Sequence, residues 1–183
     1  GHGDGGAVLS RDESMFRQMK SIANHGAEKK YYHRRVGINS RLDDIQAAVL
    51  RVKLERLDEY TQARRAAADR YDELLGDLDA VTVPCRADNR HHVFHQYTIK
   101  VKGSGNDTRD ALSDHLDSRG IPHAVYYPKP LHHLPVFEQM SDSIPSLPIA
   151  ERCSKQVLSL PMHTELTAAQ QKTVAEAIIN FLD

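Results

Sequence analysis

Residues 36–50 read VGINSRLDDIQAAVL, and they join a loop to the longest helical pattern in the chain. Ser40 and Asp43 approximate an N-terminal capping box. The helical pattern then continues to Gly76, with apolar residues at positions 42, 45, 49, 52 and 57 and a tyrosine at 60. A run of about 35 residues exceeds an ordinary globular helix, so we expect a bend or two helices, long enough to connect two lobes.

The same stretch has the clearest chemical character in the chain. Asn39, Ser40 and Arg41 stand where the helix should begin, and free backbone N–H groups at a helix N-terminus attract anions. Asn39 adds an amide donor, and Arg41 adds a planar guanidinium suited to phosphate or carboxylate. A helix cap beside a surface charge explains the same residues more simply. From the residues alone, both interpretations stay open.

The N-terminal flank reads GHGDGGAVLS over residues 1–10. Its apolar part, residues 7–9, is typical of a buried strand, and such a strand needs neighbours on both sides. No upstream residues supply these neighbours, so we expect the chain to be the back part of a larger protein. Ser10 and Glu13 form a capping box that predicts a helix over residues 15–24.

Downstream of residue 80 the pattern predicts a compact α+β lobe of about 100 residues. Val93, His95, Tyr97, Ile99 and Val101 alternate in the manner of one face of a strand. The expected elements are strands over 81–84, 92–101 and 121–128, and helices over 108–119, 149–155 and 167–182.

Composition limits the partners and the location. The 183 residues carry a formal net charge of -1, which gives no long-range attraction for nucleic acid or for an anionic membrane. No apolar run approaches the roughly 20 residues of a membrane helix. Cys85 and Cys153 lie far apart and form neither a metal-ligand spacing nor a disulfide framework. We therefore expect a cytoplasmic protein.

The 11 histidines invite a metal hypothesis. In an extended strand His92 and His95 point to opposite faces, and His91 lies too far from His95 for easy joint ligation. His132 and His133 are adjacent, an arrangement that rarely lets both bind one ion, and no Asp or Glu completes a set. We expect no metal site, and the spacing argues against the alternative of a metal-dependent hydrolase.

Six motifs stand in a characteristic order along the chain: GDGGAVLS (3–10), NHG (24–26), YYHRRVGINSRLDDIQAAVLRVKLERLDEY (31–60), FHQYTIKV (94–101), GIPHAVYYPKPLHHLPVF (120–137) and VLSLPMH (157–163). Together they resemble one family, the DegT/DnrJ/EryC1/StrS sugar-nucleotide aminotransferases, which are fold-type I enzymes dependent on pyridoxal phosphate. The resemblance covers the whole chain, but only the second half of such an enzyme.

The resemblance implies an α/β fold and a domain order. Residues 1–40 would be the edge of the large α/β domain that binds pyridoxal phosphate, together with an active-site loop. Residues 41–78 would be a long connecting helix, and residues 79–183 the small C-terminal α+β domain. The Schiff-base lysine of the family would lie just upstream of Gly1, and none of the nine lysines present stands in its place. We therefore expect this fragment alone to be inactive.

The family is also built as a homodimer with active sites at the subunit boundary. By this resemblance Asn39 would reach the cofactor phosphate of the neighbouring subunit, and Arg41 would meet the anionic part of the substrate, again in trans. The family's His-Tyr-Pro segment, which lines the sugar-nucleotide site, reads Tyr126-Tyr127-Pro128 here. Tyrosine at position 126 has no imidazole, which puts a proton-transfer role there in doubt.

The activity that the resemblance implies is transfer of an amino group from glutamate to a keto group of a nucleotide-linked hexose. The closest pattern is that of enzymes acting at the 3-position of UDP sugars, for amino-sugar or cell-surface polysaccharide (lipopolysaccharide) biosynthesis. Two alternatives remain. One is a non-catalytic sugar-nucleotide-binding or dimerisation module, if the chain truly begins at Gly1. The other is a relative that senses or regulates.

Overall fold

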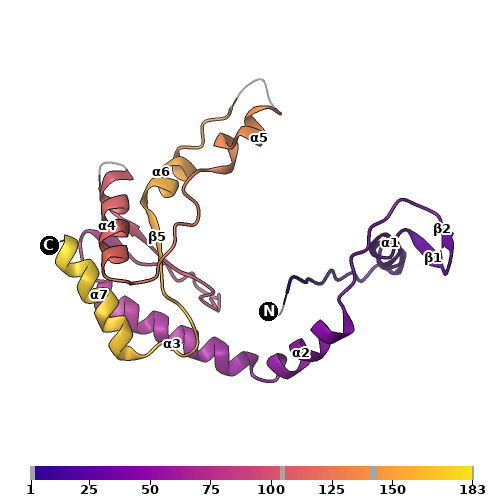
Figure 1. Cartoon of the computed structure of the whole chain (residues 1–183), viewed down its shortest axis with the longest axis horizontal. Coiled ribbons are helices and arrows are strands. Elements are labelled where there is room, and N and C mark those ends of the chain that lie inside the picture. The colour runs from indigo at the N-terminus through magenta and orange to yellow at the C-terminus, as the bar shows by residue number, and fades with distance from the viewer. Residues whose placement is uncertain (1–2, 104–105, 141–143, 183) are drawn as a thin grey trace. The chain divides into compact units, whose positions relative to one another are not determined.

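A computed structural model describes residues 3–103, 106–140 and 144–182, and Figure 1 labels most of its helices and strands. The chain divides into two compact units, Gly1–Leu57 and Asp58–Asp183. This division falls within the 41–78 segment. Within the described residues, no helix is both long and apolar enough to cross a membrane.

Unit 1 contains two helices and a two-stranded antiparallel hairpin. The elements are α1 (Glu13–Ala23), β1 (Ala27–Lys29), β2 (Tyr32–His33) and α2 (Asp44–Leu54). The predicted capping box of Ser10 is wrong, because the N-cap of α1 is Asp12, whose carboxylate accepts a hydrogen bond from the Met15 amide at 2.9 Å. The helix itself is confirmed, and it starts two residues earlier than predicted.

The prediction of a buried strand over residues 7–9 is also wrong. These residues form no strand, and Val8 and Leu9 are 74% and 91% exposed. A strand forms only when a neighbouring strand completes its hydrogen bonds, and no described strand lies beside this segment.

The long helical run is two helices, as expected. After α2 the chain turns through residues 55–56, and α3 (Leu57–Leu75) follows. The predicted Ser40–Asp43 box is wrong, because α2 begins only at Asp44 and its N-cap Asp43 makes no side-chain capping bond. The Ser40 amide instead donates to the Ala23 carbonyl at 2.9 Å, at the end of α1.

Unit 2 packs helices against a three-stranded antiparallel sheet in the order β3-β4-β5. Figure 1 shows α7 beside α3, and Gln171 of α7 donates to the Ala67 carbonyl of α3 at 2.7 Å. After α3 the elements are β3 (Val81–Thr82), β4 (Tyr97–Val101), α4 (Asn106–Ser118), η1 (Leu131–His133), α5 (Pro135–Glu138), α6 (Pro148–Gln156), β5 (Val157–Leu160) and α7 (Ala168–Leu182).

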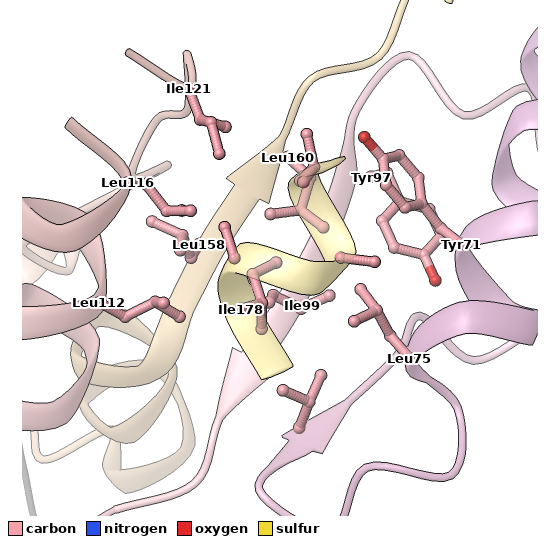
Figure 2. Close-up of a cluster of buried hydrophobic side chains, with 14 of the residues drawn as sticks. Tyr71, Leu75, Tyr97, Ile99, Leu112, Leu116, Ile121, Leu158, Leu160 and Ile178 are labelled. Carbon is pink, nitrogen blue, oxygen red and sulfur yellow. The ribbon is translucent and has the colours of Figure 1, made fainter. Parts of the chain in front are cut away.

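The hydrophobic core of unit 2 lies between the sheet and helices α3, α4 and α7 (Figure 2). Tyr97, Ile99 and Val101 of β4 are buried, which confirms the predicted alternation for this part. The prediction is wrong for Val93 and His95, because Phe94 has a positive φ of 47° that interrupts the extended backbone. Burial of the core residues is the main source of stability for this unit.

The three helices predicted for unit 2 after residue 80 are confirmed as α4, α6 and α7. Thr167 and Gln170 form the expected capping box of α7: the Gln170 amide donates to Thr167 Oγ1 at 3.2 Å, and the Thr167 amide donates to Gln170 Oε1 at 2.9 Å. The strand predicted over 121–128 is only an isolated bridge between Ala124 and Ser159, so that prediction is wrong in extent.

Candidate functional site

The loop that carries Asn39 is tied to the C-terminal end of α1. The Ile38 amide donates to the Ile22 carbonyl at 2.8 Å, and the His25 amide donates to the Ile38 carbonyl at 2.9 Å. An antiparallel bridge also joins Asn24 to Asn39. Together with the bond from the Ser40 amide, these contacts fix the backbone on both sides of Asn39.

Two glycines allow this close approach. Gly26 has a positive φ of 75°, and a Cβ there would collide with the Arg35 carbonyl. A Cβ on Gly37 would collide with the Gly26 amide nitrogen and would lie 2.6 Å from the Ile22 carbonyl oxygen. Since every obstructing atom at Gly37 belongs to the backbone, no side-chain rotation could relieve the clash. The motifs NHG and VGINS therefore encode one tight contact.

Asn39 and Arg41 lie side by side on this loop. Arg41 donates from Nε to Asn39 Oδ1 at 3.2 Å, and both residues are exposed. The bond leaves the Asn39 amide NH2 and the two terminal nitrogens of Arg41 as donors for an anion. The expectation that these residues stand at a helix N-terminus is wrong, because α2 begins three residues after Arg41.

Arg41 also lines a cavity of about 970 Å³ in unit 1. Arg17 pairs with Glu13 at 2.8 Å, and Arg35 lies 3.5 Å from Glu28. Among the described residues no carboxylate forms an ion pair with Arg41. The lining residues are Glu13, Ser14, Arg17, Gln18, Lys20, Ser21, Ala23, Asn24, Ala27, Glu28, Arg35 and Arg41.

Tyr126 and Tyr127 lie in unit 2, in the segment between the Ala124 bridge and η1. Their ring centroids are 5.9 Å apart, with the rings edge to face. Both line a cavity of about 490 Å³, mostly with apolar neighbours and with Lys129 and His132. The structure therefore groups the predicted site residues in two pairs, one in each unit.

The histidines differ from the sequence expectation. His92 Nδ1 accepts a hydrogen bond from the Phe94 amide at 2.9 Å, so this ring has a structural role next to the Phe94 ring. The statement that no acid completes a histidine set is wrong. Glu151 lies 3.2 Å from His132 Nε2 and 3.8 Å from His133 Nε2. Sequence reasoning missed Glu151 because α6 brings it to the histidines from a distant position in the chain.

Comparison with known proteins adds to this geometry. The model of the DegT/DnrJ/EryC1/StrS aminotransferase family matches residues 1–179. The chain belongs to this family. The match includes the loop of Asn39 and Arg41 and the segment of Tyr126 and Tyr127, so both pairs lie within the family's domain.

Two relatives of this chain illustrate the range of the family. A pleiotropic regulatory protein of Geobacillus stearothermophilus is 44% identical over 98% of the chain. The UDP-2-acetamido-2-deoxy-3-oxo-D-glucuronate aminotransferase of Pseudomonas aeruginosa is 37% identical over 98% of the chain. These alignments cover 48% and 47% of the two relatives, so the chain spans about half the length of the proteins it matches.

Solved structures agree with the family assignment. The crystal structure of Streptomyces venezuelae DesV in complex with a ketimine intermediate superposes with a TM-score of 0.87 at 35% identity, over 96% of this chain and 46% of that one. The NtdA structure from Bacillus subtilis, with bound cofactor PMP, gives 0.82 at 26% identity, over 93% and 40%. The predicted fold, the C-terminal part of a pyridoxal-phosphate aminotransferase, is confirmed.

Proposed function

We propose that the whole protein transfers an amino group from glutamate to a keto group of a nucleotide-linked hexose, with a 3-keto UDP sugar as the substrate. Family membership and the name of the Pseudomonas relative support this assignment. The product would enter amino-sugar or cell-surface polysaccharide biosynthesis in the cytoplasm. The observation that carries the proposal is the exposed Asn39–Arg41 pair on its tethered loop.

The donor set of this loop fits the phosphate of pyridoxal 5'-phosphate. A phosphate is recognised by amide and guanidinium donors. The oxygen of Asn39 accepts from Arg41, and its NH2 group has no partner within the part of the chain that the structure describes. We assign Asn39 to the cofactor phosphate of a neighbouring subunit. When bound, the cofactor would supply the electron sink for amino transfer. The three backbone hydrogen bonds of the loop would hold the amide in place before the cofactor arrives.

Arg41 would bind the anionic part of the substrate. Asn39 accepts from its Nε, which restricts the guanidinium plane while the terminal nitrogens stay available for two parallel hydrogen bonds. Because Arg41 has no carboxylate ion-pair partner among the described residues, a substrate anion would not have to displace one.

Tyr126 and Tyr127 would contact the sugar nucleotide through the cavity they line in unit 2. Their rings offer apolar area and their hydroxyl groups offer one donor and an acceptor each. We assign them binding roles and no proton transfer, since Tyr126 replaces the imidazole of the family motif.

The proposed assembly is a homodimer with active sites at the subunit boundary. Unit 1 exposes large apolar side chains that another protein surface would cover: Tyr31 is 80% exposed, Val36 96% and Ile45 77%. These residues lie on both sides of Asn39 in the sequence. Their exposure supports a subunit contact near the loop.

The test is an assay of the purified whole protein with glutamate and 3-keto UDP sugars, in which the amino sugar and 2-oxoglutarate are measured together. Equal amounts of the two products are expected. Loss of a hydrogen bond to a charged group costs about 1.5–3 kcal/mol, so Arg41→Lys should lower kcat/KM at least about tenfold. Arg34→Lys is the matched control, because Arg34 is exposed and pairs with Glu28 at 3.2 Å. The absence of 2-oxoglutarate formation with every sugar tested would contradict the proposal.

Intact mass after borohydride reduction with pyridoxal phosphate tests the non-catalytic alternative. One pyridoxyl phosphate group on a lysine outside residues 1–183 is expected for the aminotransferase. A protein of 20.6 kDa without a stoichiometric adduct that still binds the UDP sugar would favour the binding module.

A further inference from the structure

Three metal-ligating side chains meet in unit 2, two from η1 and one from the first turn of α6. Glu151 Oε1 lies 3.2 Å from His132 Nε2 and 3.8 Å from His133 Nε2. One ligand atom from each of the three residues lies within 4.8 Å of the others. Among the described residues this is the only such group.

The spacing of these atoms suits a small divalent ion. Zinc binds imidazole nitrogen and carboxylate oxygen at about 2.0–2.2 Å, which places neighbouring ligand atoms of a tetrahedral site about 3.3 Å apart. The separation of Glu151 Oε1 from His132 Nε2 matches this value at 3.2 Å, and the separation from His133 Nε2 is longer at 3.8 Å, so the exposed His133 ring would move slightly to ligate. The rings of His132 and His133 lie close together although the two residues are adjacent in the chain. Their centroids are 4.3 Å apart and their planes are inclined by 41°. The objection from sequence adjacency therefore fails here.

The carboxylate is already oriented by the backbone. The Leu147 amide donates to Glu151 Oε1 at 2.8 Å, and this bond, with the neighbouring histidines, lowers the pKa of Glu151 below its usual range. Such outer contacts fix a ligand and are typical of metal sites. The His132 side chain is only 10% exposed, whereas His133 is 43% exposed, which leaves an entry path from solvent.

A simple structural clamp explains only part of this arrangement. The 3.2 Å contact joins η1 to α6 through His132 and Glu151. The second histidine lies at 3.8 Å, beyond hydrogen-bond distance, so the clamp does not need it. An ion bound by all three groups would use both rings.

We propose that His132, His133 and Glu151 form a zinc-binding site with two imidazole ligands and one carboxylate. Three protein ligands leave one tetrahedral position for water or another small ligand. His132 also lines the cavity of Tyr126 and Tyr127, so a bound ion would lie at the wall of that cavity. The site does not depend on the proposed aminotransferase activity.

The test is a titration of chelator-treated protein with zinc in competition with a chromogenic chelator. One zinc ion per chain is expected, and each of His132→Gln, His133→Gln and Glu151→Gln should weaken binding by at least about tenfold. His91→Gln is the control, because His91 lies outside the group and should leave the affinity unchanged. No stoichiometric binding, or binding that survives all three substitutions, would overturn the proposal.

A second measurement uses the unsubstituted protein, so its result does not depend on whether the variants fold. Imidazole nitrogen signals in NMR spectra should shift on zinc addition for His132 and His133, and the signals of the other histidines should stay in place. Zinc-induced shifts confined to other histidines would also overturn the proposal.

Discussion

The substitution Gly37→Ala tests how the loop of Asn39 is held. A Cβ at this position would collide with the Gly26 amide nitrogen and lie 2.6 Å from both the His25 carbonyl carbon and the Ile22 carbonyl oxygen. The loop must move away from α1 to accept the methyl group. This movement breaks three backbone hydrogen bonds, donated by the amides of His25, Ile38 and Ser40. At about 0.5–1.5 kcal/mol each, the local loss is about 1.5–4.5 kcal/mol.

Amide hydrogen exchange in the whole protein measures this loss directly. A tenfold change in exchange corresponds to about 1.4 kcal/mol, so the three amides should exchange between about tenfold and 1,000-fold faster in the variant. Gly6→Ala is the matched control, because a Cβ there meets no atom within 4 Å. If the three amides keep their protection to within about threefold in Gly37→Ala, close backbone approach is not what holds the loop.

Three further substitutions test the structure of unit 2. Burial and the hydrogen bond from Tyr97 to Asp72, at 2.6 Å, raise the pKa of Tyr97 above its ordinary value near 10. Above about pH 10 the unfolded protein loses the proton of Tyr97, whereas the folded protein keeps it. The free energy of unfolding therefore has its full value below about pH 10 and declines as the pH rises further. In urea unfolding between about pH 9 and 11, the free energy of unfolding should decline less in Tyr97→Phe than in the parent protein. The control Tyr31→Phe, at an exposed tyrosine, should decline as much as the parent. Equal declines in Tyr97→Phe and the parent would contradict the role assigned to Tyr97. Thr167→Ala removes the cap of α7 and should lower the free energy of unfolding by about 1 kcal/mol. The control Thr164→Ala should cause no such loss. Equal losses in the two variants would exclude a specific effect of the cap. The side chain of Leu112 is 0% exposed, and Leu112→Ala should lower the free energy of unfolding by about 2–5 kcal/mol in the same assay. Leu131→Ala, at an exposed leucine, is the control. Similar losses in the two variants would show that the core around Leu112 is not closely packed.

Local sequence was sufficient where short-range contacts decide the structure. The helices that became α1, α4, α6 and α7 were predicted because periodicity and neighbouring turn residues act within a few positions. The cap of α7 is an example, since both of its partners lie three residues apart. The family assignment also came from ordered motifs, which need no coordinates.

Local reasoning was insufficient where a distant segment competes for the same backbone groups. Ser40 was predicted to begin a helix, but its amide is bonded to the end of α1, and α2 starts only at Asp44. Residues 7–9 have the composition of a strand, but the described residues contain no partner strand for them. In both cases the structure depends on a contact, or on a missing partner, outside the local segment.

Motifs and periodicity were enough to assign the family of this protein, the order of most helices and the residues Asn39, Arg41, Tyr126 and Tyr127, whose roles remain predictions. The folded chain was needed to show that two glycines fix the loop of Asn39 and that Glu151 meets His132 and His133. The difference is one of range, because periodicity and caps act over a few residues, whereas a backbone collision or a ligand set depends on where folding brings distant residues.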